Sequence, residues 1–400
     1  MLLHISTLLY FMCFIYLTKR KYLFFTFFLI AYSLTFSKVT LNEYFFSARD
    51  FFYLNTNILM LVFLVNAIYF FVYSMLSKLM LIGVIIYSII VTYFSTMGLI
   101  IPLNPLILYY QYGLHILPQT NNVILNLFII NLIPAFFSSN ILILLYVLFI
   151  MVYPLPLHKN EVLNKKLAII QVGLYFKNGG TPDKFYNDLK SFLMKKNVDL
   201  VVFSENIFFG YKNDYIKENT LNLLQQLEKK EIKKPIIFNF YGYKDINNIT
   251  SVFVNENSVK IRQKNILIPF VEKRGFFDKP EKTTSEYLNI DKKHHFSSFF
   301  SIKDLDISTF ICYESLFPQN IRHQSNLTII QSDYSQLNKG PDYYKTVFNG
   351  SILSKFSVSI NRVLINVQNY GGTTVIYNDW SINRDIFNRS KKEHFLTVEI

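Results

Sequence analysis

The sequence predicts two parts of different fold class, an N-terminal α-helical transmembrane bundle over residues 1–157 and a C-terminal α/β domain over residues 166–400. The first observation is charge: six Lys or Arg and two Asp or Glu occur up to Leu157, and Lys78 is the only charged side chain between Phe51 and Leu157. The second is that charged residues become frequent after this point, as on an ordinary soluble surface. The third is that short apolar runs then alternate with amphipathic stretches, which is typical of strands and helices in an α/β domain.

Helices are the expected form of the first part. More than one hundred consecutive residues with a single charge satisfy their backbone hydrogen bonds in lipid only as spanning helices. We expect about six spans, at residues 2–17, 22–36, 56–76, 79–101, 122–137 and 141–153. The basic residues Lys19, Arg20, Lys21 and Lys78 favour the first and third connections on the cytoplasmic side. Six spans then place the C-terminal domain outside the cytoplasm.

The net charge of +13 favours contact with anionic membrane lipids. The basic residues are scattered among acidic ones without an Arg-rich stripe, so we expect no nucleic-acid binding. The two cysteines, Cys13 and Cys312, do not form the pattern of a disulfide framework. The seven histidines lack metal-ligand spacing and the glycines lack a phosphate-loop pattern. We therefore expect no metal ion and no other cofactor.

Alternating strands and helices are expected in the second part. Apolar runs predict buried strands at residues 166–172, 199–203, 235–240, 307–312, 327–331 and 363–367. Amphipathic stretches predict helices at residues 183–196, 219–230 and 342–358. A hairpin over 250–254 and 259–261 makes the sheet mixed. In such a domain, polar site residues lie at strand ends.

Three polar residues stand at the ends of these strands. Glu205 follows the run VVFS, Lys264 follows VKIRQ, and Cys312 follows STFI. A cysteine attacks as thiolate, so it needs a base to take its proton and a cation to stabilise the developing oxyanion. Each residue alone has a structural explanation, as a small core residue or a solvated strand-end charge. Their order and context favour a catalytic triad.

Four segments carry a resemblance to the nitrilase, or carbon-nitrogen hydrolase, superfamily. They are KLAIIQVGLYFKN from Lys166, VDLVVFSEN from Val198, KIRQKNILIPFVE from Lys260 and STFICYES from Ser308. The later segments IIQSDYS and NVQNYGGTTV are similar to the strands that follow in that family. The apolar first half narrows the resemblance to the membrane branch that includes apolipoprotein N-acyltransferase.

The resemblance implies a C-terminal α-β-β-α sandwich with Glu205, Lys264 and Cys312 as catalytic residues and Glu272, Tyr313 and Glu314 as accessory residues. It implies acyl transfer from a phospholipid donor, through a Cys312 thioester, to the N-terminal amine of a lipoprotein acceptor. The implied location is the bacterial inner membrane, as a multi-pass protein with an extracytoplasmic catalytic domain.

The sequence departs from the family pattern in several places. Val271 replaces the glycine before the accessory glutamate, residues 332–335 read SDYS instead of Asn-Asp-Ala-Trp, and residues 351–357 lack the usual Arg and Glu. FLTVEI ends the sequence, so we expect the family's final membrane helix to be missing. Two alternatives therefore stay open: a membrane-anchored amidase that uses water in place of the amine, and a non-catalytic conjugal-transfer membrane protein with the same fold.

Overall fold

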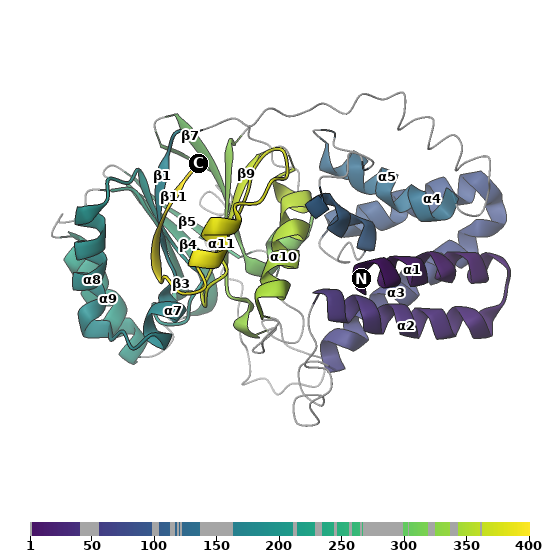
Figure 1. Cartoon of the computed structure of the whole chain (residues 1–400), viewed down its shortest axis with the longest axis horizontal. Helices are drawn as coiled ribbons and strands as arrows, with labels where there is room; N and C mark the ends of the chain where they lie inside the picture. Colours follow the sequence, from purple (N-terminus) through teal and green to yellow (C-terminus); the bar gives the residue numbers. More distant parts are fainter. Residues whose placement is uncertain are drawn as a thin grey trace.

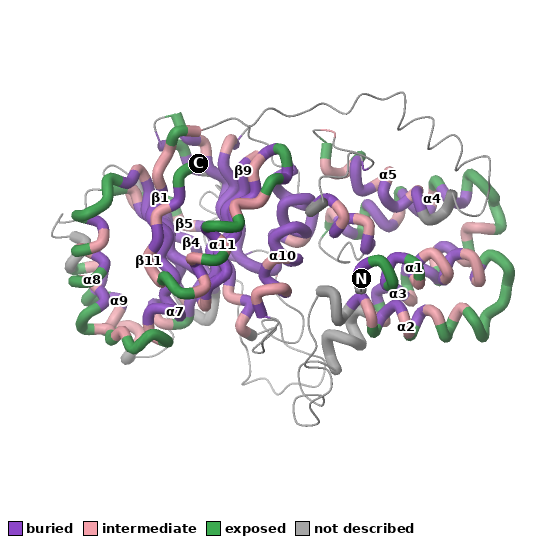
Figure 2. The backbone as a smooth tube through the Cα atoms, viewed as in Figure 1, coloured by how far each residue is buried: buried purple, intermediate pink, exposed green. Residues whose placement is uncertain are grey.

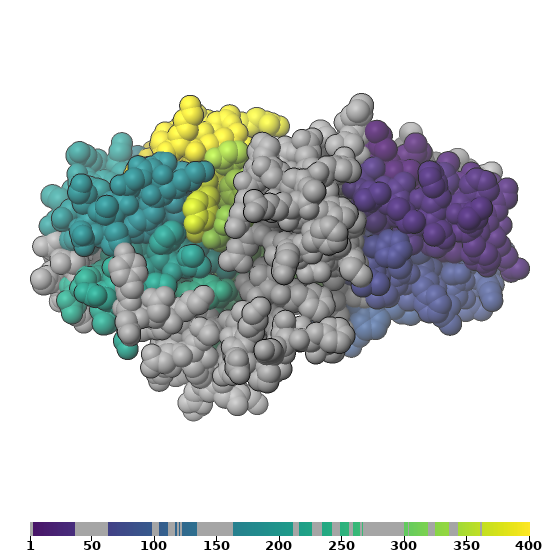
Figure 3. All heavy atoms as spheres, turned by 90° about the horizontal axis from the view of Figure 1, so that it is seen from below, coloured from purple at the N-terminus to yellow at the C-terminus, as the bar shows by residue number. Residues whose placement is uncertain are grey.

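The computed structural model of the chain describes residues 2–40, 56–97, 104–112, 117, 120, 122–136, 163–210, 214–228, 234–243, 246–255, 258–264, 266, 299–302, 304–318, 325–336, 343–360 and 362–400. The N-terminal half is helical and lies at one end of an elongated molecule, and the α/β domain lies at the other (Figures 1 and 3). The elements of the helical half are α1 (Leu2–Thr18), α2 (Tyr22–Thr40), α3 (Thr56–Leu76), η3 (Ser77–Leu79), α4 (Met80–Thr96), η4 (Pro105–Tyr112) and α5 (Val123–Phe136).

Five of the six expected spans coincide with these helices, and the sixth, 141–153, lies outside the described residues. Within the described part of the chain, only the stretch Phe63–Thr96 is both long and apolar enough to cross a membrane. The stretch is interrupted at η3, and Met80 has a positive φ of 54° there. The apolar helices Leu3–Thr18, Tyr22–Phe36 and Val123–Ile133 are shorter.

The helical half has an aromatic core and an apolar exterior. Phe14 packs edge-to-face on Phe70, Tyr73 and Tyr10, with ring centroids 4.7–5.2 Å apart. Exposed positions recur along the helices (Figure 2), and many carry large apolar side chains, among them Leu8, Leu23, Phe24, Phe27, Ile30, Phe71, Met75, Ile82, Ile89 and Tyr93. An exterior of this kind is unusual for a protein surrounded by water.

The α/β domain contains two mixed sheets. The six-stranded sheet has the order β11-β1-β2-β3-β4-β5 and the five-stranded sheet the order β10-β9-β8-β7-β6. The strands are β1 (Lys166–Ile170), β2 (Leu200–Phe203), β3 (Ile236–Tyr243), β4 (Ile246–Asn255), β5 (Ser258–Gln263), β6 (Phe299–Ile302), β7 (Leu305–Ile311), β8 (Leu327–Ser332), β9 (Val363–Gln368), β10 (Thr374–Ile376) and β11 (Phe395–Glu399). Strands β1, β2 and β3 are parallel, as are β7, β8 and β9. The carboxyl ends of β2 and β7 carry Glu205 and Cys312.

The helices of this domain are α7 (Val172–Lys177), α8 (Pro182–Lys195), α9 (Asp214–Glu228), α10 (Tyr343–Val358) and α11 (Arg384–Arg389), with the short turns η5 (Cys312–Leu316) and η6 (Tyr334–Gln336). Apolar side chains from one face of each sheet form a shared core between the sheets. The other face of the six-stranded sheet packs on α8 and α9, and that of the five-stranded sheet packs on α10. These layers form the expected α-β-β-α sandwich (Figure 1).

Helix α10 lies between the five-stranded sheet and the helical half (Figure 1). Nearly all of its side chains are buried, and Ile352, Leu353 and Phe356 belong to one apolar cluster with side chains from α1 to α5. Trp380, from the loop before α11, joins the same cluster and stacks on Tyr110 of η4. The two halves therefore share a continuous core.

Some element boundaries differ from those that the sequence predicts. The first strand ends at Ile170 and α7 begins at Val172, because the amides of Gly173 and Leu174 donate to Asn369 instead of continuing the sheet. Strands β6 and β10 and helix α11 are too short to give a periodic signal.

Candidate active site

Glu205 and Lys264 form a buried ion pair just beyond the ends of β2 and β5, two strands of the six-stranded sheet that are separated by β3 and β4. Lys264 Nζ donates to Glu205 Oε1 at 3.4 Å, and the backbone N–H of Asp333 donates to Glu205 Oε2 at 2.9 Å. The Lys264 side chain is fully buried and Glu205 is 5% exposed. An unpaired charge is costly at such depth, so the two charges stabilise each other. Strands β2 and β5 thus deliver a carboxylate and an ammonium to one point.

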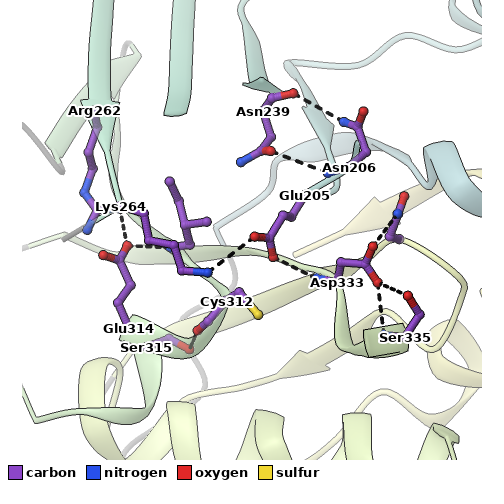
Figure 4. A network of polar contacts seen from close by, with 12 residues as sticks. Glu205, Asn206, Asn239, Arg262, Lys264, Cys312, Glu314, Ser315, Asp333 and Ser335 are labelled. Atoms are coloured by element: carbon purple, nitrogen blue, oxygen red, sulfur yellow. Dashed lines mark hydrogen bonds and ion pairs between the residues drawn. The ribbon is translucent and has the colours of Figure 1, made fainter. Parts of the chain in front are cut away.

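Cys312 approaches this pair from the five-stranded sheet. It is the first residue after β7 and has a φ of 46°, a conformation that costs energy for any residue except glycine. In enzymes with a nucleophile turn, a sharp strained turn between a strand and a helix projects the reactive side chain out of the backbone. Figure 4 shows the Cys312 side chain below Glu205 and Lys264, with the sulfur pointing away from its own turn. The thiol is 2% exposed.

Tyr334 lies near both Cys312 and Glu205, and both groups affect its pKa. Burial raises the pKa of the Tyr334 hydroxyl, and negative charge on Cys312 and on Glu205 raises it further. Tyr334 is therefore a neutral phenol at any physiological pH, and it packs against α10 through Gly350.

A second carboxylate, Asp333, lies beside Glu205. Its side chain accepts hydrogen bonds from Ser335 N (3.0 Å), Ser335 Oγ (2.6 Å) and Asn369 Nδ2 (2.9 Å). Burial raises the pKa of Asp333, and these donors together with the Lys264 charge offset part of that effect. Asn369 Oδ1 in turn accepts from Ser204 Oγ at 3.1 Å and Gly173 N at 2.6 Å. This network fixes the loops that hold the Glu205 backbone and the Asp333 amide.

The structure brings five of the six predicted site residues into this region: Glu205, Lys264, Cys312, Tyr313 and Glu314. All of these except Tyr313 are labelled in Figure 4. Tyr313 is next to Cys312 in the chain and packs edge-to-face on Phe317, with ring centroids 5.2 Å apart. Glu314 is fully buried and forms an ion pair with Arg262. Glu272 lies outside the described residues.

Three further residues of the site were not among the candidates. Asp333 and Asn369 each follow a buried strand, as Glu205 and Cys312 do, so the same rule applied to β8 and β9 would have selected them. Arg262 lies inside β5. The alternation of side chains along a strand predicts which face of the sheet Arg262 is on, but it does not predict that Glu314 is its partner. No group of three His, Cys, Asp or Glu side chains that could hold a metal ion occurs among the residues with described positions.

The arrangement combines a thiol, a carboxylate and an ammonium in a buried setting. The carboxylate can take the thiol proton, and the ammonium can stabilise negative charge on a carbonyl oxygen. Low local polarity strengthens both effects. Such a site is suited to a thiolate attack on an acyl group.

Comparison with known proteins gives weak structural similarities. The chain is similar to an amidase from Nesterenkonia sp., with a TM-score of 0.35 and 14% identity over 59% of this chain and 90% of that one. It is also similar to a glutamine-dependent NAD+ synthetase from Acinetobacter baumannii, with a TM-score of 0.34 and 15% identity over 55% of this chain. The chain spans 42% of the synthetase. No protein-family model and no curated protein sequence matches it.

Proposed function

We propose that the chain is a membrane-bound acyltransferase that moves an acyl group from a phospholipid, through a thioester on Cys312, to the N-terminal amine of a lipoprotein. One observation carries the proposal: a strained, buried cysteine faces a buried Glu205–Lys264 pair delivered from the opposite sheet. A purely structural cysteine needs neither the strained backbone nor the two charges.

In the first half-reaction, Glu205 accepts the thiol proton of Cys312, and the thiolate attacks the ester carbonyl carbon of the phospholipid. Lys264 stabilises the negative charge on the carbonyl oxygen. The carbon–oxygen ester bond then breaks, and protonated Glu205 returns its proton to the leaving lysophospholipid oxygen. The acyl group remains on Cys312 as a thioester.

In the second half-reaction, the acceptor amine attacks the thioester carbonyl and passes a proton to Glu205. The carbon–sulfur bond breaks and leaves an amide on the acceptor. Glu205 returns the proton to the Cys312 sulfur. Water in place of the amine would release a fatty acid, which is the outcome expected of a hydrolase.

The exterior of the helical half supports a membrane location. Helix α3 has 21 residues and α4 has 17, within the range of about 17 to 25 residues that spans a bilayer core. Their exposed side chains include Phe71, Ile82 and Ile89. Each CH₂ group of a lipid that leaves the bilayer loses about 0.8 kcal/mol of apolar stabilisation, so a helical half within the membrane would let acyl chains stay in lipid while the ester reaches Cys312.

The test is incubation of the purified protein with a phospholipid that carries a labelled acyl chain. We expect a hydroxylamine-sensitive adduct on the wild type and none on Cys312→Ala. Cys13→Ala is the matched control, because Cys13 is the only other cysteine and lies buried in α1. We expect it to form the adduct at the wild-type rate.

A diacylglyceryl-cysteine peptide is then added as acceptor. Transfer of the label to the peptide amine supports the acyltransferase, whereas release of free fatty acid at the same rate with and without peptide indicates a hydrolase. A wild type that forms no adduct overturns the proposal.

A further inference from the structure

Arg262 is the charged residue that links the two sheets beside the active site. It lies on β5, the edge strand of the six-stranded sheet, two residues before Lys264. Its guanidinium is 5.5 Å from the ring centroid of Phe310 on β7, in the other sheet, and Arg262 Nη1 pairs with Glu314 Oε1. The side chains of Arg262 and Glu314 are 2% and 0% exposed. Both charges are thus removed from water at the junction of the two sheets.

Glu314 belongs to the turn that carries the nucleophile. Its Oε1 accepts the backbone N–H of Ile311 at 2.6 Å, directly before Cys312. On the other side of the turn, Ser315 Oγ donates to the Cys312 carbonyl at 2.6 Å and contacts Ser354 Oγ of α10 at 2.7 Å. The strained backbone of Cys312 is therefore held from both sides.

A continuous chain of contacts runs from the lysine strand to the cysteine turn (Figure 4). It starts at Arg262 on β5, passes through the Glu314 carboxylate, and ends at the amide preceding Cys312. Lys264 is the residue directly after β5, and its backbone N–H donates to the Ile249 carbonyl at 2.9 Å, which continues the pairing with β4. Side chains two residues apart in extended backbone project to the same face, so Arg262 and Lys264 lie on the same side. Any shift of the turn relative to β5 would break the buried pair.

From this geometry we infer that Arg262 is a positioning residue: through Glu314 it fixes the Cys312 turn in register with Lys264. The inference rests on the proposed role of Cys312 as nucleophile. Stability alone is a poor reason for the pair, because buried ion pairs are often replaceable by apolar residues without loss of stability. A role in geometry explains why two charges are buried at this position.

The test measures the reactivity of Cys312 with iodoacetamide as a function of pH, in a Cys13→Ala background so that one thiol reports. The Arg262→Met substitution keeps the side-chain length and removes the charge, and Glu314→Gln keeps an acceptor for the Ile311 amide. The double variant Arg262→Met/Glu314→Gln carries no unpaired buried charge. Retained fluorescence of Trp380, the only tryptophan, shows that each variant is folded.

We expect the midpoint of the alkylation profile to rise by about one pH unit in the double variant, equivalent to a tenfold smaller thiolate fraction at neutral pH. Arg262→Lys should restore most of the profile because it retains a cation opposite Glu314. The rate of acyl adduct formation should fall in the double variant while its dependence on phospholipid concentration stays unchanged.

A folded double variant with the wild-type alkylation profile overturns the inference. The inference is also overturned if each single variant changes the alkylation profile and the double variant restores it. Arg262 would then only neutralise the charge of Glu314. Alkylation requires no phospholipid. A wild type that forms no acyl adduct would therefore count against the proposed function and leave the test of Arg262 intact.

Discussion

The indole of Trp380 stacks on the phenol of Tyr110, with ring centroids 4.5 Å apart and planes inclined by 27°. Trp380 comes from the α/β domain and Tyr110 from η4 in the helical half. Lys355 Nζ lies 5.6 Å from the Trp380 ring, and Phe356 lies 5.4 Å from Tyr110. A cluster of aromatic side chains together with the buried amine of Lys355 thus joins the two halves next to α10.

Tyr110→Ala should loosen this junction. Truncation of a buried aromatic residue typically costs about 3–5 kcal/mol, and here it also exposes Trp380 to water. We expect the fluorescence of Trp380 to shift to longer wavelength in the folded variant. Tyr109→Ala is the control, because Tyr109 is the neighbouring tyrosine of η4 and contacts His4 of α1. An unchanged emission spectrum in Tyr110→Ala would contradict the stacked arrangement.

Ile89→Arg tests whether the apolar exterior of α4 faces lipid. Ile89 is 54% exposed near the middle of α4, where Arg costs about 2.5–3.5 kcal/mol of insertion free energy in a membrane helix. We expect a smaller carbonate-resistant membrane fraction. Met97→Arg, at the end of the same helix, should insert normally since Arg can extend to the interface there. Equal membrane fractions for both variants would mean that α4 does not face lipid.

Asp333→Asn should change how stability depends on pH. The pKa of Asp333 is raised in the folded state by burial, so folding favours its protonated form. Protonated Asp333 therefore contributes fully to the free energy of unfolding of the wild type below about pH 3.9, the pKa of an aspartate in the unfolded chain. This contribution is lost as the pH rises through the pKa of Asp333 in the folded state. We expect the wild type to become less stable relative to Asp333→Asn as the pH is raised from about 4 to neutrality. Thermal unfolding in detergent, followed by Trp380 fluorescence, measures the difference, and a difference that is constant with pH would show that the Asp333 carboxyl does not titrate in this range.

Gly350→Ala should destabilise the site although alanine favours helices. A Cβ at this position would lie 2.4 Å from Cε2 and 2.9 Å from Oη of Tyr334. Overpacking of this kind typically costs about 1–3 kcal/mol, against a gain of about 1 kcal/mol in helix propensity. We expect a lower unfolding temperature and slower acyl adduct formation, because the displaced Tyr334 ring belongs to the same buried cluster as Cys312. A more stable variant would show that the Tyr334 ring moves freely.

The sequence was sufficient to locate the strands that carry Glu205, Lys264 and Cys312, because buried parallel strands are continuous apolar runs and their ends are marked by polar residues. The first five helices were likewise visible as long uncharged stretches. These features are local in the chain. Whether the helical half crosses a membrane several times remains a prediction.

The residues that surround Glu205, Lys264 and Cys312 could not be predicted in the same way. Arg262 and Glu314 are 52 positions apart, and their pairing depends on how two sheets face each other. The contact between Tyr110 and Trp380 joins positions 270 residues apart. Local periodicity indicates that a side chain is buried but not which distant side chain it meets.

Helix α10 has consequences for how the molecule can be divided. One side of it covers the five-stranded sheet and the other is covered by the N-terminal helices, so Phe356 and its neighbours never meet water in the intact chain. A fragment starting after residue 162 would expose the apolar side of α10 to solvent and would tend to self-associate. The α/β domain and the helical half are therefore joined through the buried flank of α10, and truncated proteins should keep both.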